Sequence, residues 1–315
     1  MSIASQFKTI GICGIGQMGA SAAVAFQRAG YRVLLWARAH DKLRAVAARL
    51  GEMEQWSNEQ LGAAPRPGGE IILEPELARL DATADAVLEC IIEVMEEKVA
   101  LLKKLESCRR RGALLMSATS GLSITEMGQR SGTEAVLVGA HFWNPPHLIP
   151  VVEMVASPVT PPAMLEAACE LMNDIGKTPI PCKDVPGFIG NRLMHAMWRE
   201  ALALVDAGVC SAEDIDRVVK LTFALRLPAL GPMENMDLVG LEAVERIHKY
   251  LLPSLARNVE PSPCMSAKVN AGALGMKSGQ GFYNWTRRDP RRVVENRDAQ
   301  IVQQLKFLKQ IGELP

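Results

Sequence analysis

A glycine-rich segment near the start of the chain has the spacing of a dinucleotide-binding loop. It follows a strand-like apolar run, opens a helical pattern, and reads Gly14-Ile15-Gly16-Gln17-Met18-Gly19. The first glycine of such a loop permits a tight turn, the second lets the backbone approach a pyrophosphate, and the third lets strand and helix pack closely. The amides that open the helix favour an anion. We predict that a dinucleotide contacts this segment through Gly14, Gly16, Gln17, Met18 and Gly19; a tight turn without a ligand is the alternative.

The residues after the second apolar run bear on which dinucleotide is bound. An NAD site places an acidic residue there to accept the ribose hydroxyls, but this chain has Ala37 followed by Arg38. Without the carboxylate nothing repels a 2′-phosphate, and a guanidinium can pair with one. We therefore favour NADP over NAD and take Arg38 as a cofactor contact. If Arg38 is an ordinary surface arginine, NAD remains open.

One of the five histidines stands where a proton-transfer group would be needed. His141 comes at the end of the apolar run Ala135-Val-Leu-Val-Gly-Ala, and Glu153 lies on the next strand-like run. The carboxyl ends of parallel strands form the edge where nucleotide-binding folds hold ligands. If Glu153 reaches the far ring nitrogen, it fixes the tautomer and supports the imidazolium, which suits the acid–base half of an alcohol dehydrogenase. A structural histidine is the alternative, and prolines between His141 and His147, with no third ligand, argue against a metal.

The elements that would position these groups alternate between strand and helix through about residue 184. Helical patterns start at Met18 and Asp41, a charged one follows Glu93, and the strand-like runs are Thr9 to Ile15, Val33 to Trp36, Ala86 to Ile91, Ala113 to Met116, Ala135 to Val138, Val151 to Val155 and Thr178 to Cys182. Such alternation predicts an α/β Rossmann fold with a doubly wound, mostly parallel sheet. Residues 52–69 look like an irregular insertion. After Pro186-Gly187 the apolar residues recur at helical spacing, so we predict a dinucleotide-binding domain at 1–184 and an all-α domain at 185–315.

Composition excludes several classes of function. The 315 residues carry 35 basic and 35 acidic side chains, so no net charge favours nucleic acid or an anionic membrane. No apolar run is long enough to span a membrane, and the strand-like start leaves no room for a secretory signal. The seven cysteines form no ligand spacing. We expect a cytoplasmic protein with reduced cysteines and neither a nucleic-acid nor a membrane partner.

These motifs together resemble the L-3-hydroxyacyl-CoA dehydrogenase superfamily over nearly the whole chain. The matching segments keep the family's order and are Gly14–Gly19, Val87–Glu93 with Lys98, Ser117–Ser120, His141–Pro145 with Glu153, Pro186–Arg192 and Lys277–Tyr283. The resemblance implies the two-domain fold above, with a helical domain that completes the substrate site and forms a homodimer.

The resemblance also implies roles for individual residues. His141 corresponds to the general acid/base and Glu153 to its partner, while Ser120 and Asn191 correspond to groups that bind the reacting oxygen, beside Asn144. Among the cofactor contacts it adds two charged residues, Glu93 and Lys98. Each also has a structural reading, since Ser120 and Asn191 could satisfy helix starts and Glu93 and Lys98 could be surface charges.

Departures from the family pattern concern the cofactor and the substrate. Ala37 replaces the usual acidic residue, and Ala118 replaces an asparagine. Where acyl-CoA enzymes carry a lysine-rich helical hairpin, residues 41–80 hold five basic and seven acidic side chains, and a ligand as anionic as CoA would need positive charge there. The run from Asn144 to Glu153 is more like the L-gulonate and L-carnitine 3-dehydrogenase branch, whose substrates are free acids, whereas Lys277–Tyr283 is more like the acyl-CoA branch.

The sequence therefore predicts an NAD(P)-dependent oxidoreductase that interconverts a 3-hydroxy and a 3-keto carboxyl compound, favouring a free acid. The alternatives are a true L-3-hydroxyacyl-CoA dehydrogenase of fatty-acid metabolism and a catalytically silent dinucleotide-binding structural or sensor protein. Another rival is the group of β-hydroxyacid dehydrogenases, including the glycerol-phosphate type, that use a lysine. Here the residues after Asn191 lack such a lysine, and only His195 keeps this rival open.

Overall fold

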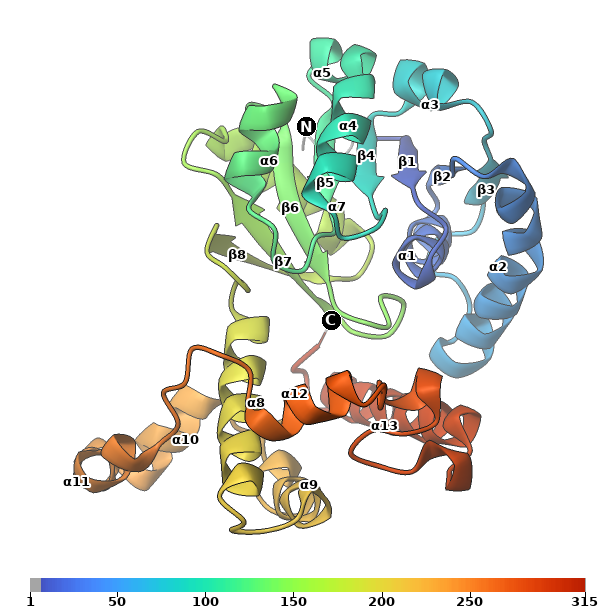
Figure 1. Cartoon of the computed structure of the whole chain (residues 1–315). Coiled ribbons are helices and arrows are strands. Elements are labelled where there is room, and N and C mark those ends of the chain that lie inside the picture. Colours follow the sequence, from blue (N-terminus) through green and yellow to red (C-terminus); the bar gives the residue numbers. More distant parts are fainter. Residues whose placement is uncertain (1–6, 315) are drawn as a thin grey trace. The chain divides into compact units, whose positions relative to one another are not determined.

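The computed structural model describes residues 7–314, and the chain divides into two compact units. The first unit ends at Arg192 and takes in the C-terminal residues from Lys309, while the second is Leu193–Leu308 (Figure 1). Among residues 7–314, the strands all lie in the first unit, and the second unit is helical. This matches the predicted α/β Rossmann fold followed by an all-α part.

The first unit is built on one sheet of eight strands. Its order is β3-β2-β1-β4-β5-β6-β7-β8, and the strands are β1 (Thr9–Cys13), β2 (Arg32–Trp36), β3 (Glu70–Leu73), β4 (Ala86–Glu89), β5 (Leu114–Ser117), β6 (Leu137–Phe142), β7 (Val151–Ala156) and β8 (Thr178–Lys183). All neighbours run parallel except β6 and β7, which are antiparallel. Strand order therefore changes direction between β1 and β4, where folds of this type bind ligands beyond the carboxyl ends of the strands.

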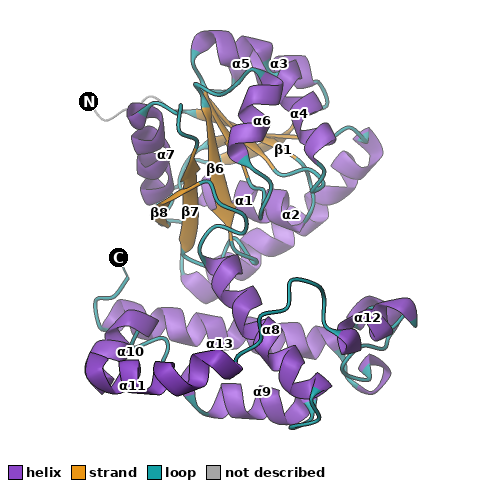
Figure 2. Cartoon of the chain, turned by 60° about the vertical axis from the view of Figure 1, so that its left-hand side comes forward, coloured by secondary structure: helices purple, strands orange, loops and turns teal. Residues whose placement is uncertain are grey.

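Seven helices of the first unit cover the two faces of this sheet (Figure 2). They are α1 (Gln17–Arg28), α2 (His40–Leu61), α3 (Leu77–Thr83), α4 (Met95–Lys104), α5 (Glu106–Arg111), α6 (Ile124–Ser131) and α7 (Pro162–Asp174). Apolar side chains of α1, α2 and α7 pack on one face and those of α3 to α6 on the other. Because both faces are covered, β1, β4 and β5 are apolar almost throughout rather than alternating.

Two details differ from the sequence prediction. Residues 52–61, expected to be irregular, form the last turns of α2, where Ser57 is buried and donates to the Met53 carbonyl oxygen at 2.7 Å. Strand β3 follows the true loop and was not anticipated, because it has four residues and a half-buried pattern. Short strands with little alternation give the weakest sequence signal.

The second unit consists of helices joined by short turns. They are most of α8 (Gly190–Asp206), then α9 (Ala212–Leu221), α10 (Pro232–Val239), α11 (Leu241–Leu251), α12 (Pro263–Asn270) and α13 (Pro290–Gln310), with 3-10 turns η2 (Phe223–Leu225), η3 (Leu252–Ser254), η4 (Met276–Ser278) and η5 (Trp285–Arg287). Of the described residues in these helices only Val302 is buried. No helix within residues 7–314 is long and apolar enough to cross a membrane.

Candidate active site

The glycine loop has backbone geometry that requires its glycines. Gly14 has φ +124°, and a Cβ there would lie 2.5 Å from the Cys90 carbonyl oxygen. A Cβ at Gly19 would lie 2.0 Å from the Gly14 carbonyl oxygen, so strand and helix could not approach as they do. A Cβ at Gly16 would meet nothing within 4 Å. The backbone at Gly16 is thus open to a ligand, and α1 starts beside it with no acidic residue in its first turn.

The side chains expected beside the adenosine half of a dinucleotide make contacts of their own. The Arg38 guanidinium is exposed and lies 2.9 Å from a Glu97 carboxylate oxygen. Gln17 is exposed as well, and its amide oxygen accepts from Arg49 of α2 at 2.5 Å. Ala37 leaves the end of β2 without a carboxylate. Arg38, expected to contact the cofactor, is thus paired with Glu97 in this structure.

His141 and Glu153 are direct neighbours across the antiparallel pair of strands. They occupy opposite positions in the β6–β7 register, and Nδ1 of His141 lies 2.6 Å from Oε2 of Glu153. Side chains opposite each other in an antiparallel pair emerge on the same face, which is why these two meet. The imidazole is 5% exposed and Glu153 is 3% exposed. The structure thus brings together the two residues that were separated by twelve positions in the sequence.

The second oxygen of Glu153 binds the start of α8. Oε1 accepts from the backbone N–H groups of Ile189 at 2.8 Å and Gly190 at 2.9 Å. Burial acts to raise the pKa of this carboxyl, but the hydrogen bonds from Gly190, His141 and Ile189 outweigh it and hold the pKa below its usual range. Glu153 is therefore an ionised group that joins β7, the histidine and the first turn of α8.

Ser120 and Asn191, expected beside the reacting oxygen, are in contact through one hydrogen bond. The Asn191 side-chain amide donates to the Ser120 backbone carbonyl oxygen at 2.9 Å. The Ser120 side chain is exposed, as is Asn144, which follows β6. Ser123, not Ser120, caps α6 by accepting from the Glu126 N–H. The capping role considered for Ser120 is therefore wrong, and its hydroxyl has no such structural task.

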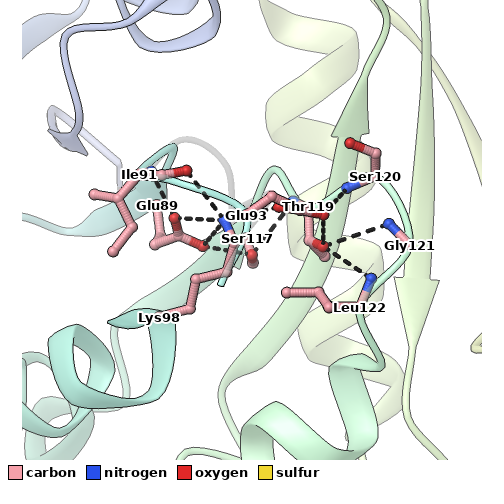
Figure 3. Close-up of polar contacts among 9 residues, drawn as sticks. All are labelled: Glu89, Ile91, Glu93, Lys98, Ser117, Thr119, Ser120, Gly121 and Leu122. Carbon is pink, nitrogen blue, oxygen red and sulfur yellow. Dashed lines mark hydrogen bonds and ion pairs between the residues drawn. The ribbon is translucent and has the colours of Figure 1, made fainter. Parts of the chain in front are cut away.

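A charged cluster lies where β4 and β5 end, and it includes Glu93 and Lys98 (Figure 3). The Lys98 ammonium is 1% exposed and lies 2.8 and 3.0 Å from the two oxygens of buried Glu89, and 3.3 Å from Glu93. Ser117 donates to the Glu89 carboxylate at 2.6 Å. Lys98 is therefore enclosed by protein groups, whereas Glu93 is 44% exposed and open to a ligand.

Glu93 also holds the loop that carries Ser120. One of its oxygens accepts from the Thr119 hydroxyl at 2.5 Å and from the Ser120 N–H at 2.8 Å. Burial acts to raise the pKa of Glu93, but the Thr119 bond, the Lys98 charge and the Ser120 N–H hold it below its usual range. Thr119 and Ser117 belong to the matching segment Ser117–Ser120, but the sequence assigned neither of them a role of its own.

The second histidine of the metal alternative lies against an aromatic ring. His147, paired with His141 in the metal alternative, instead packs edge-on against Trp56 of α2, with ring centroids 5.4 Å apart. Within residues 7–314 no group of three or more candidate ligand side chains is placed to hold an ion.

The fold and the sequence both match one family of oxidoreductases. Residues 9–185 match the model for the 3-hydroxyacyl-CoA dehydrogenase NAD-binding domain, and residues 187–285 match that for the 3-hydroxyacyl-CoA dehydrogenase C-terminal domain. The class is therefore a dehydrogenase that uses a nicotinamide dinucleotide. The chain belongs to the 3-hydroxyacyl-CoA dehydrogenase family, as its motifs implied.

Two kinds of similar protein are relevant to the substrate. The chain is 29% identical to a 5-formyl-3-hydroxy-2-methylpyridine 4-carboxylate 5-dehydrogenase of Mesorhizobium japonicum, over 94% of this chain and 96% of that protein. A crystal structure of an enzyme with that activity, described as an NAD+ dependent dismutase, has TM-score 0.91 and 28% identity and covers 96% of this chain and 99% of its own. The chain is also 33% identical to a probable 3-hydroxybutyryl-CoA dehydrogenase of Deinococcus radiodurans, over 87% of this chain and 99% of that protein.

Proposed function

We propose that this protein interconverts a hydroxyl and a carbonyl group at C3 of a small carboxylic acid, with His141 as general acid/base. The observation that carries the proposal is the 2.6 Å contact between His141 Nδ1 and Glu153 Oε2. An ionised carboxylate can only accept, so the imidazole carries its proton on Nδ1 and leaves Nε2 as the acceptor. Nε2 takes the hydroxyl proton during oxidation and returns it during reduction, and Glu153 supports the imidazolium formed in between.

The hydride requires a bound nicotinamide dinucleotide, which accepts it or donates it at the ring. The open backbone at Gly16 and the start of α1 would hold the pyrophosphate of that cofactor, and Glu93 would border the nicotinamide. Arg38 and the missing carboxylate at Ala37 favour NADP over NAD in this proposal. The NAD+ dependence of the structurally similar dismutase keeps NAD as the alternative.

Three further side chains would orient the substrate. The Ser120 hydroxyl and the Asn191 amide would bind the oxygen that gains or loses a proton, and Asn144 would border the same site. The hydrogen bond from Asn191 to the Ser120 carbonyl oxygen supports this proposal, because it holds the Asn191 amide close to the segment that carries the Ser120 hydroxyl. Holding the reacting group in one position lowers the activation barrier, because less entropy is then lost on reaching the transition state.

A free acid is the better substrate candidate than a CoA thioester. The part of the chain from residue 41 to 80 has more acidic than basic side chains, which disfavours a highly anionic ligand. The similarity to a pyridine carboxylate dehydrogenase over nearly the whole chain supports a substrate that carries its own carboxylate. One candidate besides a 3-hydroxyacyl-CoA is therefore an aliphatic 3-hydroxy acid. The other is a formyl-substituted pyridine carboxylate, which would react at its formyl carbon and not at C3: water would first add to the aldehyde, and the hydrate would lose a hydroxyl proton and a hydride to give a carboxylic acid.

A substrate panel tests the proposal. The purified chain would be assayed with NAD and NADP against 3-hydroxy acids, their CoA thioesters and 5-formyl-3-hydroxy-2-methylpyridine 4-carboxylate. We expect saturation by a free acid with no gain from the thioester, and a lower KM for NADP that rises in the Arg38→Gln variant. Turnover of the thioester alone would establish the acyl-CoA alternative. Cofactor binding without oxidation of any compound would favour a silent dinucleotide-binding protein.

The helical unit would contribute the substrate side and a dimer contact. Large apolar side chains stand exposed on its helices, among them Leu238 at 72% and Tyr250 at 69%. A cavity of about 830 Å³ lies among α8, α9 and the segment 258–285, with Trp198, Leu202 and Phe282 in its wall. Because exposed large apolar side chains often mark an interaction surface, we propose that a second copy covers those of this unit.

Sedimentation of the full-length protein tests the dimer. The wild type should sediment with twice the chain mass, and Tyr250→Asp should shift it toward the single mass because a carboxylate would have to be buried without a partner. Val159→Asp is the control, since Val159 is 57% exposed in the first unit. A wild type of single mass at micromolar concentration would contradict the dimer but not the chemistry above.

A further inference from the structure

Phe188 has a backbone conformation that a bulky residue rarely adopts. Its φ is +47°, and within residues 7–314 every other positive φ belongs to a glycine. The side chain is nonetheless 1% exposed and is one of the largest fully buried groups of the first unit. A residue stays in this region only when its surroundings hold it there, and such residues gather at functional sites.

The carboxylate that binds the histidine also holds this turn. The Phe188 N–H donates to the Val185 carbonyl oxygen at 2.9 Å, and the next two backbone N–H groups donate to Oε1 of Glu153 at 2.8 and 2.9 Å. Phe188 therefore belongs to the same connected group as His141 through Glu153. Its unusual backbone sets where its ring points.

The Phe188 ring contacts the imidazole directly. The ring centroids of Phe188 and His141 are 5.7 Å apart at an interplanar angle of 55°, and those of Trp143 and His141 are 5.3 Å apart at 51°. Both are in the range of favourable tilted aromatic pairs. Trp143 in turn packs on the start of α8, where a Cβ at Gly190 would lie 2.2 Å from the indole.

We propose that Phe188, together with Trp143, positions His141 so that its Nε2 keeps one direction. The single hydrogen bond at Nδ1 fixes one ring atom and leaves the ring free to tilt, because the χ2 torsion of histidine has a broad energy minimum. Two aromatic neighbours remove that freedom. Phe188 touches no reacting atom in this account, so it is a positioning residue, and the proposal rests on the proposed role of His141.

The experiment combines kinetics with nitrogen NMR of the histidine rings in the full-length protein. The test variant is Phe188→Leu. The matched control is Phe26→Leu, because Phe26 is also fully buried and also packs at an angle on one aromatic ring, that of Tyr31 at 5.8 Å, but on α1. Phe188→Gly adds a second comparison, since glycine adopts positive φ without strain and keeps the turn while removing the ring. His141→Asn assigns the His141 signals.

We expect Phe188→Leu and Phe188→Gly each to lower kcat by on the order of 10- to 100-fold, with the cofactor KM within about 2-fold. The two His141 nitrogen signals should broaden or move toward each other as the ring loosens. Phe26→Leu should lower the melting temperature by a similar amount but change neither kcat nor the His141 nitrogen signals. The proposal is overturned if Phe188→Gly folds and keeps kcat, or if His141 signals in Phe188→Leu match the wild type. Because NMR needs no substrate, absence of turnover in the wild type would count against the proposed function and leave this test intact.

Discussion

The two units of the chain differ in how completely each buries its own apolar side chains. In the first, both faces of the sheet are covered and side chains such as Leu88 and Leu115 are fully enclosed. In the helical unit, α8 to α12 contribute no buried residue among those described. A single chain is thus sufficient to fix the histidine, its carboxylate and the glycine loop. The helical unit leaves large apolar side chains such as Leu238 and Tyr250 exposed, and the proposed dimer rests on this observation.

Removing the imidazole is the sharpest test of the claim that the first unit carries the chemistry. His141→Ala should lower kcat by about 10²- to 10⁴-fold, the usual contribution of a positioned proton-transfer group. Cofactor affinity should stay near the wild-type value, because the glycine loop lies at β1 and α1, away from β6. Steady-state kinetics and titration of the reduced cofactor by fluorescence measure the two quantities. An alanine variant that keeps most of its rate would remove the mechanism.

The buried ion pair between Lys98 and Glu89 should make a large contribution to the stability of the first unit. Lys98→Met leaves the Glu89 carboxylate buried without its cation, and breaking such a pair destabilises a protein by about 3–5 kcal/mol. Urea unfolding would measure the loss. The double variant Lys98→Met with Glu89→Gln should recover much of it, since no unpaired charge remains. Equal losses in the single and double variants would mean that packing, and not charge, is what matters there.

Lys177 provides a pH-dependent test of the same unit. Its ammonium is 7% exposed and donates to the carbonyl oxygens of Pro146 and Ile149 at 2.5 and 2.9 Å, in the connection between His141 and Glu153. Burial lowers the pKa of Lys177 from 10.5 to about 8. Between these values the unfolded chain binds more protons than the native one, so Lys177 makes stability rise with pH, by roughly 3 kcal/mol at most.

The comparison with Lys177→Met isolates that contribution. Other groups titrate in the same range, but they cancel in the difference between wild type and variant. From about pH 8 upward, the unfolding free energy of the wild type should rise relative to that of Lys177→Met. The native amine loses its proton in this range, and as a neutral group it still donates to both carbonyl oxygens. A difference that stays constant with pH would show that the ammonium is not desolvated.

The sheet and the glycine loop were predictable because their signals are local. Apolar runs separated by helical patterns, and glycines at fixed spacing after a strand, follow from the backbone geometry of single elements. The contact of His141 with Glu153 was expected from the family resemblance, since twelve intervening residues do not determine a register. The antiparallel pairing of β6 with β7 supplies the physical reason.

Contacts between distant segments could not be predicted from the sequence. Nothing near Phe188 in the sequence indicates a positive φ. The two N–H groups that follow it bind Glu153, thirty-five positions earlier, and such a contact between distant segments leaves no local pattern. Lys98 looked like a surface charge or a cofactor contact, and only the fold encloses it beside Glu89. The first half of the insertion expected at 52–69 is helical. The sequence did not reveal this, because the segment is mostly polar and has few buried residues to form an apolar pattern.

The smallest expected effect concerns the helical unit. Leu238 is 72% exposed in one chain, which by itself predicts that Leu238→Ala changes stability by less than about 0.5 kcal/mol. If a second copy buries this side chain, the loss should approach about 1.5–2 kcal/mol. It should then appear only at protein concentrations where the dimer forms, because association stabilises by mass action. Thermal unfolding over a wide concentration range measures this, with Val159→Ala as the control on the first unit. A Leu238→Ala melting temperature equal to that of the wild type at every concentration would place this part of α10 outside the dimer contact.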